Sequence, residues 1–165
     1  MENIYKEALK VHKKNKGKIK IEPVVPIKNK HDLSLLYTPG VAEASRQIAS
    51  DKKLSYDLTW RGRAVAIISD GSAVLGLGNI GPEAALPVME GKALLLKQFA
   101  GVDGVPIVIN TQNVSEIIQF VKNITPSFAG INLEDIAAPA CLQIEEALQD
   151  IGIPVFHDDQ HGTAI

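Results

Sequence analysis

The sequence predicts an α/β fold of three layers, in which a mostly parallel sheet lies between two layers of helices and follows a helical N-terminus. From residue 65 onward, short apolar runs typical of buried strands alternate with longer segments of helical periodicity. This order, βαβαβαβ, is typical of a parallel sheet covered on both faces. The 165 residues are 45% hydrophobic and 22% charged, which is ordinary for one globular domain.

The N-terminal third is predicted to hold two helices joined by an extended segment. Residues 3–14 carry apolar side chains spaced for one helical face, and residues 17–31 are rich in lysine and proline, as in a linker. Thr38 followed by Pro39 is typical of a helix cap and a first-turn proline, so a second helix is expected from there to about Ser50.

Four strands and three helices are predicted in the remainder. The strands are the apolar runs at 65–70, 106–111, 130–133 and 153–157. The helices are expected at about 82–100, after Asn113, and between Pro139 and Gly152. The residues expected to face the core from the last two helices are Ile117, Ile118, Val121, Ile144 and Leu148.

Every predicted strand ends in a polar group, and two strands end in a pair of acids. These groups are Asp70, Thr111, Glu134 with Asp135, and Asp158 with Asp159. The carboxyl ends of parallel strands meet at one edge of the sheet, so both pairs could face one site. Adjacent carboxylates repel each other, and a cation relieves that repulsion. Because carboxylates without nearby cysteine favour Mg²⁺ or Mn²⁺, a hard divalent metal is the first hypothesis.

Two other interpretations of these residues stay open. Asp, Asn and Thr also cap helices that follow strands, which would explain Asp70, Thr111 and Asp158. His157 and His161 have the i, i+4 spacing of a zinc pair on a helix, although the apolar run before them favours a strand.

Two further side chains are candidates for acid–base chemistry. Lys92 falls on the apolar stripe predicted for the helix at 82–100, which is formed by Ala85, Val88, Leu96 and Phe99. Removal from water would favour a neutral amine that can act as a base. The alternative is that its ammonium reaches solvent or pairs with an acid. Tyr37 precedes the Thr38 cap, and its expected role is to pack on the first helical turn near Ala42 unless other evidence indicates catalysis.

The glycines Gly76, Gly78 and Gly81 match the pattern G-x-G-x-x-G, a weak signal for dinucleotide binding. The preceding strand is predicted to end at Asp70, so the loop does not follow it directly, and no acid follows at the spacing of a ribose contact. Close backbone packing, or a turn around a small anion, is the preferred explanation.

Charge and composition exclude several classes of protein. The formal net charge of -2 gives no basic excess for nucleic-acid binding, and the lysines between residues 10 and 20 are typical of a solvated face, with phosphate binding as the alternative. The single cysteine, Cys141, cannot form an intrachain disulfide and fits a reducing compartment. No apolar run approaches the roughly 20 residues of a membrane span, and no signal-peptide core is present. We therefore expect a cytoplasmic protein.

Several segments together resemble the N-terminal, substrate-binding domain of malic enzyme in its short bacterial form. They are residues 36–42, 69–71, 76–81, 90–92, 131–135 and 156–164, in the order and spacing of the family. One family arginine that touches substrate is replaced by Ala73, so carboxylate recognition is expected from elsewhere, such as the amides of the glycine loop. The resemblance implies an N-terminal helix and linker at 1–31 and a substrate and metal domain at 32–165. It also implies that the nucleotide-binding Rossmann domain is absent from this chain.

The activity implied by the resemblance is oxidative decarboxylation of malate to pyruvate and CO₂ with NAD or NADP. The implied ligands of Mn²⁺ or Mg²⁺ are Glu134, Asp135 and Asp159. Lys92 would be the general base, Tyr37 the general acid, and Asp158 would support Lys92 or orient substrate. A homodimer is expected, and the chain alone is not expected to turn over.

Three alternatives to this activity are kept. One is a Mg²⁺-dependent phosphoryl-transfer or receiver-like domain, which also gathers aspartates at strand ends. Another is a non-catalytic remnant acting as an interaction module, which need not bind Mn²⁺. The third is malolactic chemistry on the same fold, which only product analysis separates from malic chemistry.

Overall fold

The structure is a computed structural model and describes residues 2–157 and 159. The chain divides into two compact units, one formed by residues 1–19 with 63–165 and the other by residues 20–62. The boundary between 1–31 and 32–165 stays a prediction. Within the described ranges, no helix is both long and apolar enough to cross a membrane.

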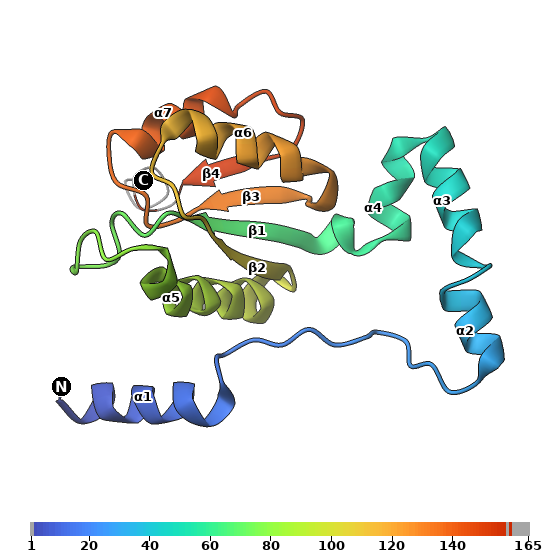
Figure 1. The fold of residues 1–165 in the computed structure, drawn as a ribbon, viewed down its shortest axis with the longest axis horizontal. Coiled ribbons are helices and arrows are strands. Elements are labelled where there is room, and N and C mark those ends of the chain that lie inside the picture. The colour runs from blue at the N-terminus through green and yellow to red at the C-terminus, as the bar shows by residue number, and fades with distance from the viewer. Residues whose placement is uncertain (1, 158, 160–165) are drawn as a thin grey trace. The chain divides into compact units, whose positions relative to one another are not determined.

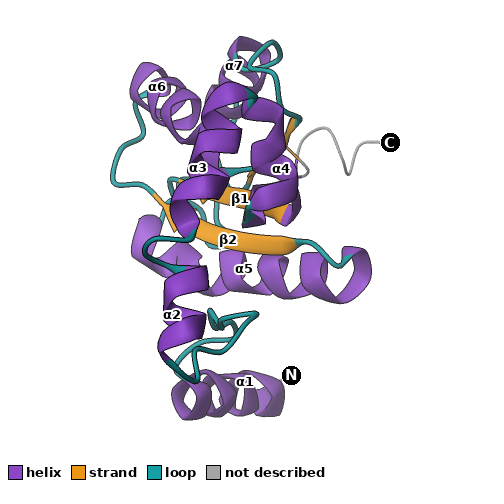
Figure 2. Ribbon diagram, turned by 90° about the vertical axis from the view of Figure 1, so that its right-hand side faces the viewer, coloured by secondary structure: helices purple, strands orange, loops and turns teal. Residues whose placement is uncertain are grey.

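The larger unit is a three-layer α/β/α sandwich, so the predicted fold class is confirmed (Figures 1 and 2). Its strands are all parallel, in the order β2-β1-β3-β4. They are β1 (Ala64–Ser69), β2 (Asp103–Val108), β3 (Gly130–Leu133) and β4 (Val155–His157). One face of the sheet is covered by α5 (Pro82–Leu95), and the other by α6 (Val114–Ile124) and α7 (Ala140–Ala147).

The central strand β1 supplies side chains to both apolar layers. Ala66 and Ile68 pack with α6 and α7, whereas Ile67 packs with α5, because successive side chains of a strand point to opposite faces. All three are fully buried, and each buried isoleucine contributes about 1.5–3 kcal/mol. A strand covered on both faces must be apolar throughout, which explains the unbroken run in the sequence.

The predicted core positions on α6 and α7 agree with the structure. Ile117, Val121, Ile144 and Leu148 have no exposed surface, and Ile118 is partly buried against the same cluster.

The predicted strand at 106–111 was placed three residues too late. Gly101 adopts a left-handed φ of 69°, ends the preceding helix and leads the chain almost directly into β2. That helix also changes character, since α5 is continued by a π-helical turn at Leu96–Ala100. Phe99, expected on the buried stripe, is therefore 82% exposed.

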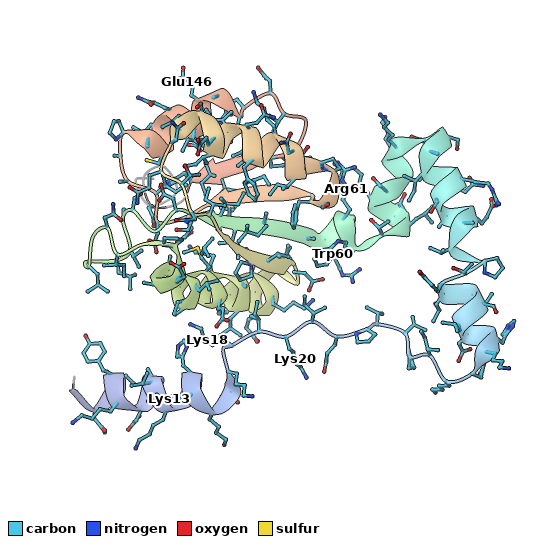
Figure 3. All side chains as sticks on the ribbon, viewed as in Figure 1. Lys13, Lys18, Lys20, Trp60, Arg61 and Glu146 are labelled. Carbon is cyan, nitrogen blue, oxygen red and sulfur yellow. The ribbon has the colours of Figure 1, made fainter. Side chains whose placement is uncertain are left out.

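The first helix, α1 (Glu2–Asn15), confirms the prediction at 3–14. The segment after α1 is bonded to α5 through Lys18, which lies beneath that helix (Figure 3). The backbone N–H of Lys18 donates to Glu90 Oε2 at 2.9 Å, and its Nζ donates to the carbonyl of Pro87 at 2.6 Å.

The smaller unit is helical. It contains α2 (Lys30–Leu36), α3 (Val41–Ser50), α4 (Ser55–Leu58) and short 3₁₀ turns. The sequence analysis missed α2, although Asn29 caps it by accepting from the N–H of Asp32 at 2.9 Å.

The second predicted helix is present, but the cap assigned to Thr38 is wrong. The helix α3 begins at Val41 with Gly40 as its N-cap and without a side-chain cap. Gly40 is required by close packing, because a Cβ there would lie 2.5 Å from the carbonyl oxygen of Leu35. Tyr37 ends α2, donates its N–H to the Leu33 carbonyl, and is 65% exposed.

Candidate metal centre

The acids that follow β3 lie at the point where the direction of the sheet reverses. The chain passes from β1 to β2 on one side and then to β3 on the other, so the carboxyl ends of β1 and β3 flank a topological switch point. Open α/β sheets bind ligands at such a crevice. Glu134 and Asp135 directly follow β3, and Asp159 lies two residues beyond β4.

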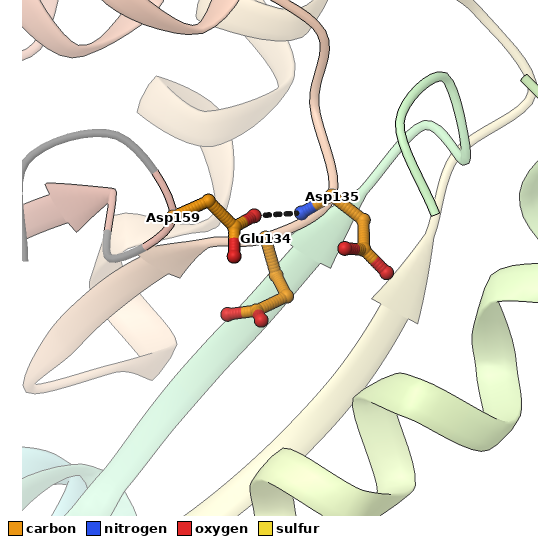
Figure 4. A group of neighbouring side chains, drawn as sticks. All are labelled: Glu134, Asp135 and Asp159. Atoms are coloured by element: carbon orange, nitrogen blue, oxygen red, sulfur yellow. Dashed lines mark hydrogen bonds between the residues drawn. The ribbon is translucent and has the colours of Figure 1, made fainter. Parts of the chain in front are cut away.

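Three carboxylates converge at this edge (Figure 4). One oxygen each of Glu134, Asp135 and Asp159 lies within 4.8 Å of the others. Glu134 and Asp135 are 4% exposed, and Asp159 is exposed. The three acids line a hollow of about 340 Å³ together with Ala73, Leu75 and Ile136.

The residues present fit a hard divalent ion. All three donors are carboxylate oxygens, the ligand type that Mg²⁺ and Mn²⁺ prefer. Two oxygens on one Mg²⁺ are at most about 4.2 Å apart, twice the metal–oxygen distance, so small side-chain rotations would complete the set. A cation would also offset the repulsion between the carboxylates of Glu134 and Asp135, which are largely removed from water.

Asp135 has an unusual backbone. Its φ of 52° lies in the left-handed region, which costs about 1–2 kcal/mol for a residue with a side chain, although Asp tolerates it better than most. Its N–H donates to Asp159 Oδ2 at 3.0 Å, which links the loops after β3 and β4. Its carbonyl accepts from the N–H of Ala73, also at 3.0 Å.

Lys92 reaches the same cluster. Its Nζ lies 3.2 Å from Glu134 Oε2, and the two side chains are 22% and 5% exposed. The fully buried residues of α5 are Ala85, Met89 and Ala93. Lys92 lies between Val88 and Leu96 at i±4 spacing, and both of these are partly buried against that cluster, so it is at the edge of the apolar stripe. Of the two alternatives for this lysine, the structure shows the pair with an acid, and it places that pair at the metal candidates.

The outcomes for the remaining predicted site residues differ from one residue to the next. Asp158 and His161 lie outside the described residues, so the role of Asp158 stays a prediction. His157 belongs to β4 and is 1% exposed, which agrees with a strand and not with the helix that the zinc alternative needs. Tyr37 belongs to the smaller unit, and its catalytic role stays a prediction.

The glycine loop packs on its own backbone. Val74 and Gly78 form an antiparallel bridge, and the carbonyl of Gly71 accepts from the N–H groups of Ile80 and Gly81 at 3.2 Å. A Cβ at Gly71 would lie 2.1 Å from the Gly81 oxygen. Gly78 and Gly81, with φ of 78° and 86°, are needed for their backbone conformation. A Cβ at Gly76, Gly78 or Gly81 would meet no atom within 4 Å, so close packing, the preferred explanation for these glycines, is wrong, and the anion turn stays a prediction.

Two strand-end residues have local partners. Asp70, 2% exposed, accepts from both the N–H and the hydroxyl of Ser72. Thr111 donates its hydroxyl to Glu116 at 2.5 Å in the first turn of α6, so a role at a helix start accounts for it. The sequence analysis missed Ser72, because its only sequence signal is its position two residues after Asp70.

Comparison with known proteins gives one consistent result. The family model "Malic enzyme, N-terminal domain" matches residues 16–118 and 110–149. The chain is 58% identical over 164 residues to a bifunctional malic/malolactic enzyme of Bacillus subtilis, covering 99% of this chain and 40% of that protein. It is 53% identical over 161 residues to an NADP-dependent malic enzyme of Rhizobium meliloti, covering 96% and 21%.

Solved structures agree with these relatives. The NAD-dependent malic enzyme of Thermotoga maritima superposes with a TM-score of 0.93 at 55% identity, covering 95% of this chain and 44% of that one. The malic enzyme of Pyrococcus horikoshii gives 0.94 at 55% identity, covering 98% and 38%. The chain thus spans less than half the length of each of these proteins.

Proposed function

This chain belongs to the malic enzyme family, and we propose that it forms the substrate and metal half of an enzyme that oxidatively decarboxylates malate to pyruvate and CO₂. The observation that carries this proposal is the convergence of Glu134, Asp135 and Asp159 beside Lys92 at the switch point of the sheet. Oxidation and decarboxylation of a small 2-hydroxy acid can use a hollow, a divalent metal and a base together, and these residues can line the hollow, hold the metal and act as the base.

The three acids are proposed to hold Mn²⁺ or Mg²⁺. A divalent ion there would polarise the C2 oxygen of malate and of the ketone that forms from it. The hollow of about 340 Å³ falls in the usual size range of small-molecule sites.

Lys92 is proposed to take the proton from the C2 hydroxyl as hydride leaves for the nicotinamide. A base must be neutral to accept a proton, and the carboxylate of Glu134 at 3.2 Å favours the ammonium form. A divalent ion bound to Glu134 would offset the negative charge of that carboxylate. The carboxylate would then favour the ammonium form of Lys92 less, and the neutral amine would be more accessible. Tyr37 is proposed to protonate C3 after CO₂ leaves, and Asp158 to support Lys92 or orient substrate.

The redox cofactor is proposed to be NAD or NADP, since relatives of both kinds are similar to this chain. We place its binding mainly in the Rossmann domain that the family carries after the segment matched here. We also propose a homodimer, which light scattering in solution would test.

The test of the proposed function is Lys92→Met in the protein that carries this sequence, assayed with malate, Mn²⁺ and either nicotinamide. Loss of a general base should lower kcat by about 100- to 10,000-fold. Lys97→Met is the matched control, because Lys97 is also a paired lysine in this region but contacts Asp103 at the surface. Undiminished malate-dependent reduction of nicotinamide by Lys92→Met would refute the assignment of the base.

One relative supports a second candidate activity. The Bacillus subtilis protein is named as both a malic and a malolactic enzyme. Conversion of malate to lactate is therefore proposed as a side activity, and chromatographic separation of pyruvate from lactate after turnover tests it. Family membership leaves the phosphoryl-transfer alternative without support.

A further inference from the structure

The end of β1 and the loop after it are bonded directly to the loop that carries two of the proposed metal ligands. Three backbone groups of residues 134–137 make these bonds. The N–H of Glu134 donates to the Ile68 carbonyl at 2.8 Å, and the Asp135 carbonyl accepts from Ala73 at 3.0 Å. The N–H of Ala137 donates to the hydroxyl oxygen of Ser72 at 2.8 Å. Of the three, only the last depends on a side chain.

The direction of the Ser72 hydroxyl follows from its neighbours. The Ala137 N–H can only donate, so the Ser72 oxygen accepts from it. The hydroxyl proton then goes to Asp70 Oδ1, which lies 2.6 Å away and also accepts the Ser72 N–H at 2.9 Å. Donation to a carboxylate makes this a charge-assisted bond, and a chain of such bonds is mutually strengthening. Asp70 is 2% exposed, so water competes little for it.

The loop that receives this bond needs external support. Asp135 holds a left-handed φ of 52°, and the chain reverses there between β3 and α7. The Ala137 carbonyl accepts from Cys141, the first hydrogen bond into α7. Ser72 therefore fixes the loop where it meets the helix, and Ala73 fixes it one residue after Glu134.

We propose that Ser72 is a positioning residue for the metal centre. Through its bonds to Asp70 and Ala137, it holds the loop so that Glu134 and Asp135 converge with Asp159. This inference rests on the proposed metal site. It assigns to Ser72 no contact with substrate or metal.

A second serine provides a matched control. Ser115 makes the same local turn with Asn113, donating its N–H at 2.9 Å and its hydroxyl at 2.6 Å to one side-chain oxygen. These distances equal those between Ser72 and Asp70. Ser115 lies at the start of α6 and not in the loops of the metal centre. Replacing either serine by alanine keeps its backbone N–H bond and removes the same kind of hydroxyl bond, but only the Ser72 hydroxyl also bonds the metal loop.

The experiment measures Mn²⁺ affinity by electron paramagnetic resonance for the wild type and for Ser72→Ala, Ser72→Thr and Ser115→Ala. Loss of an outer partner of metal ligands typically costs about 10–100-fold, so Ser72→Ala should weaken binding by at least about tenfold. Ser72→Thr keeps the hydroxyl and should restore most of the affinity, and Ser115→Ala should match the wild type. If Ser72→Ala does not fold, Ser72→Cys replaces it, because a thiol fills the space but is a weak acceptor.

A second measurement does not need the metal. Hydrogen exchange of the Ala137 amide in metal-free protein should be faster in Ser72→Ala than in the wild type, since its acceptor is gone. Ser115→Ala should leave that amide unchanged.

The outcomes separate the two proposals. Wild-type Mn²⁺ affinity in Ser72→Ala, or equal losses in Ser72→Ala and Ser115→Ala, would overturn the positioning role and leave the metal site standing. A wild type that binds no Mn²⁺ would overturn the metal site itself, and the positioning role with it.

Discussion

The carboxyl ends of β2 and β3 both lead into polar residues, but the two ends use them differently. After β2, Asn113 caps α6 by accepting from the N–H groups of Ser115 and Glu116. After β3, Glu134 and Asp135 do not cap α7, which has Pro139 at its N-cap position and no side-chain cap. These acids instead line the hollow with Asp159.

The position of a strand in the sheet therefore decides whether the polar residues at its end form a candidate site. The strand β2 lies at the edge, and its polar residues satisfy the helix that follows. The strand β3 lies beside β1 at the switch point, where the crevice forms. Capping was the alternative to metal binding for Thr111, and the structure favours a role at the helix start after β2 and convergence of the acids after β3.

The largest effect is expected from Asp135→Asn. Asparagine tolerates the left-handed backbone as well as aspartate does, so the change removes charge and leaves the turn intact. Since outer partners of metal ligands are worth about 10–100-fold, loss of a ligand should weaken Mn²⁺ binding by at least about 100-fold. Calorimetric titration measures it, with Thr111→Val as the control at the other strand end. Equal Mn²⁺ affinities in Asp135→Asn and Thr111→Val would show that the residues after β3 do not differ from those after β2 in metal binding.

Mn²⁺ should stabilise the folded state only when the acids after β3 are intact, whether or not the polar residues after β2 are changed. A ligand at 100 times its Kd stabilises the folded state by about 2.7 kcal/mol. Mn²⁺ should therefore raise the Tm of the wild type and of Asn113→Ala alike, and leave Asp135→Asn nearly unchanged. Calorimetric melting with Mn²⁺ and with a chelator measures this, and identical melting of the wild type in both would contradict it.

A smaller effect is expected at the β2 end. Asn113→Ala removes the cap of α6 and should lower the free energy of unfolding by about 1 kcal/mol, within the usual range for caps. Urea denaturation measures this loss, and Asn123→Ala near the other end of α6 is the control. An unchanged Mn²⁺ affinity in Asn113→Ala would support the difference between the two strand ends. A lower affinity in that variant would contradict it.

The smallest effect is expected at the opposite, amino end of β2. Asp103 accepts from Lys97 at 2.6 Å and from Arg63 at 2.7 Å, and these cations, Lys97 foremost, hold the pKa of its carboxyl below the ordinary value. A lowered folded-state pKa stabilises the fold above about pH 4, and this contribution is lost as pH falls through the folded pKa. Asp103→Asn should thus cost less than about 1 kcal/mol at pH 7, with the difference shrinking in acid. Urea denaturation across pH checks it, and a difference that grows in acid would contradict it.

Much of the fold was predictable from local pattern. The runs at β1 and β3 and the inward residues of α6 and α7 follow from periodicity, because a buried face must be apolar at each of its positions. Doublets of acids after two apolar runs likewise indicated Glu134, Asp135 and Asp159. Local pattern failed where a single residue changed the path of the chain, as Gly101 does before β2 and Gly40 before α3.

The amino-acid order by itself determined most of the strands and helices, the places where acids follow strands, and the resemblance to malic enzyme. Only the tertiary structure decided that β1 and β3 are neighbours, that Lys92 pairs with Glu134, and that Ser72 bonds Ala137 across 65 residues. The physical reason is that periodicity records which side of an element is buried but not what covers it. Hydrogen bonds between distant loops arise from packing, and they leave no spacing in the sequence.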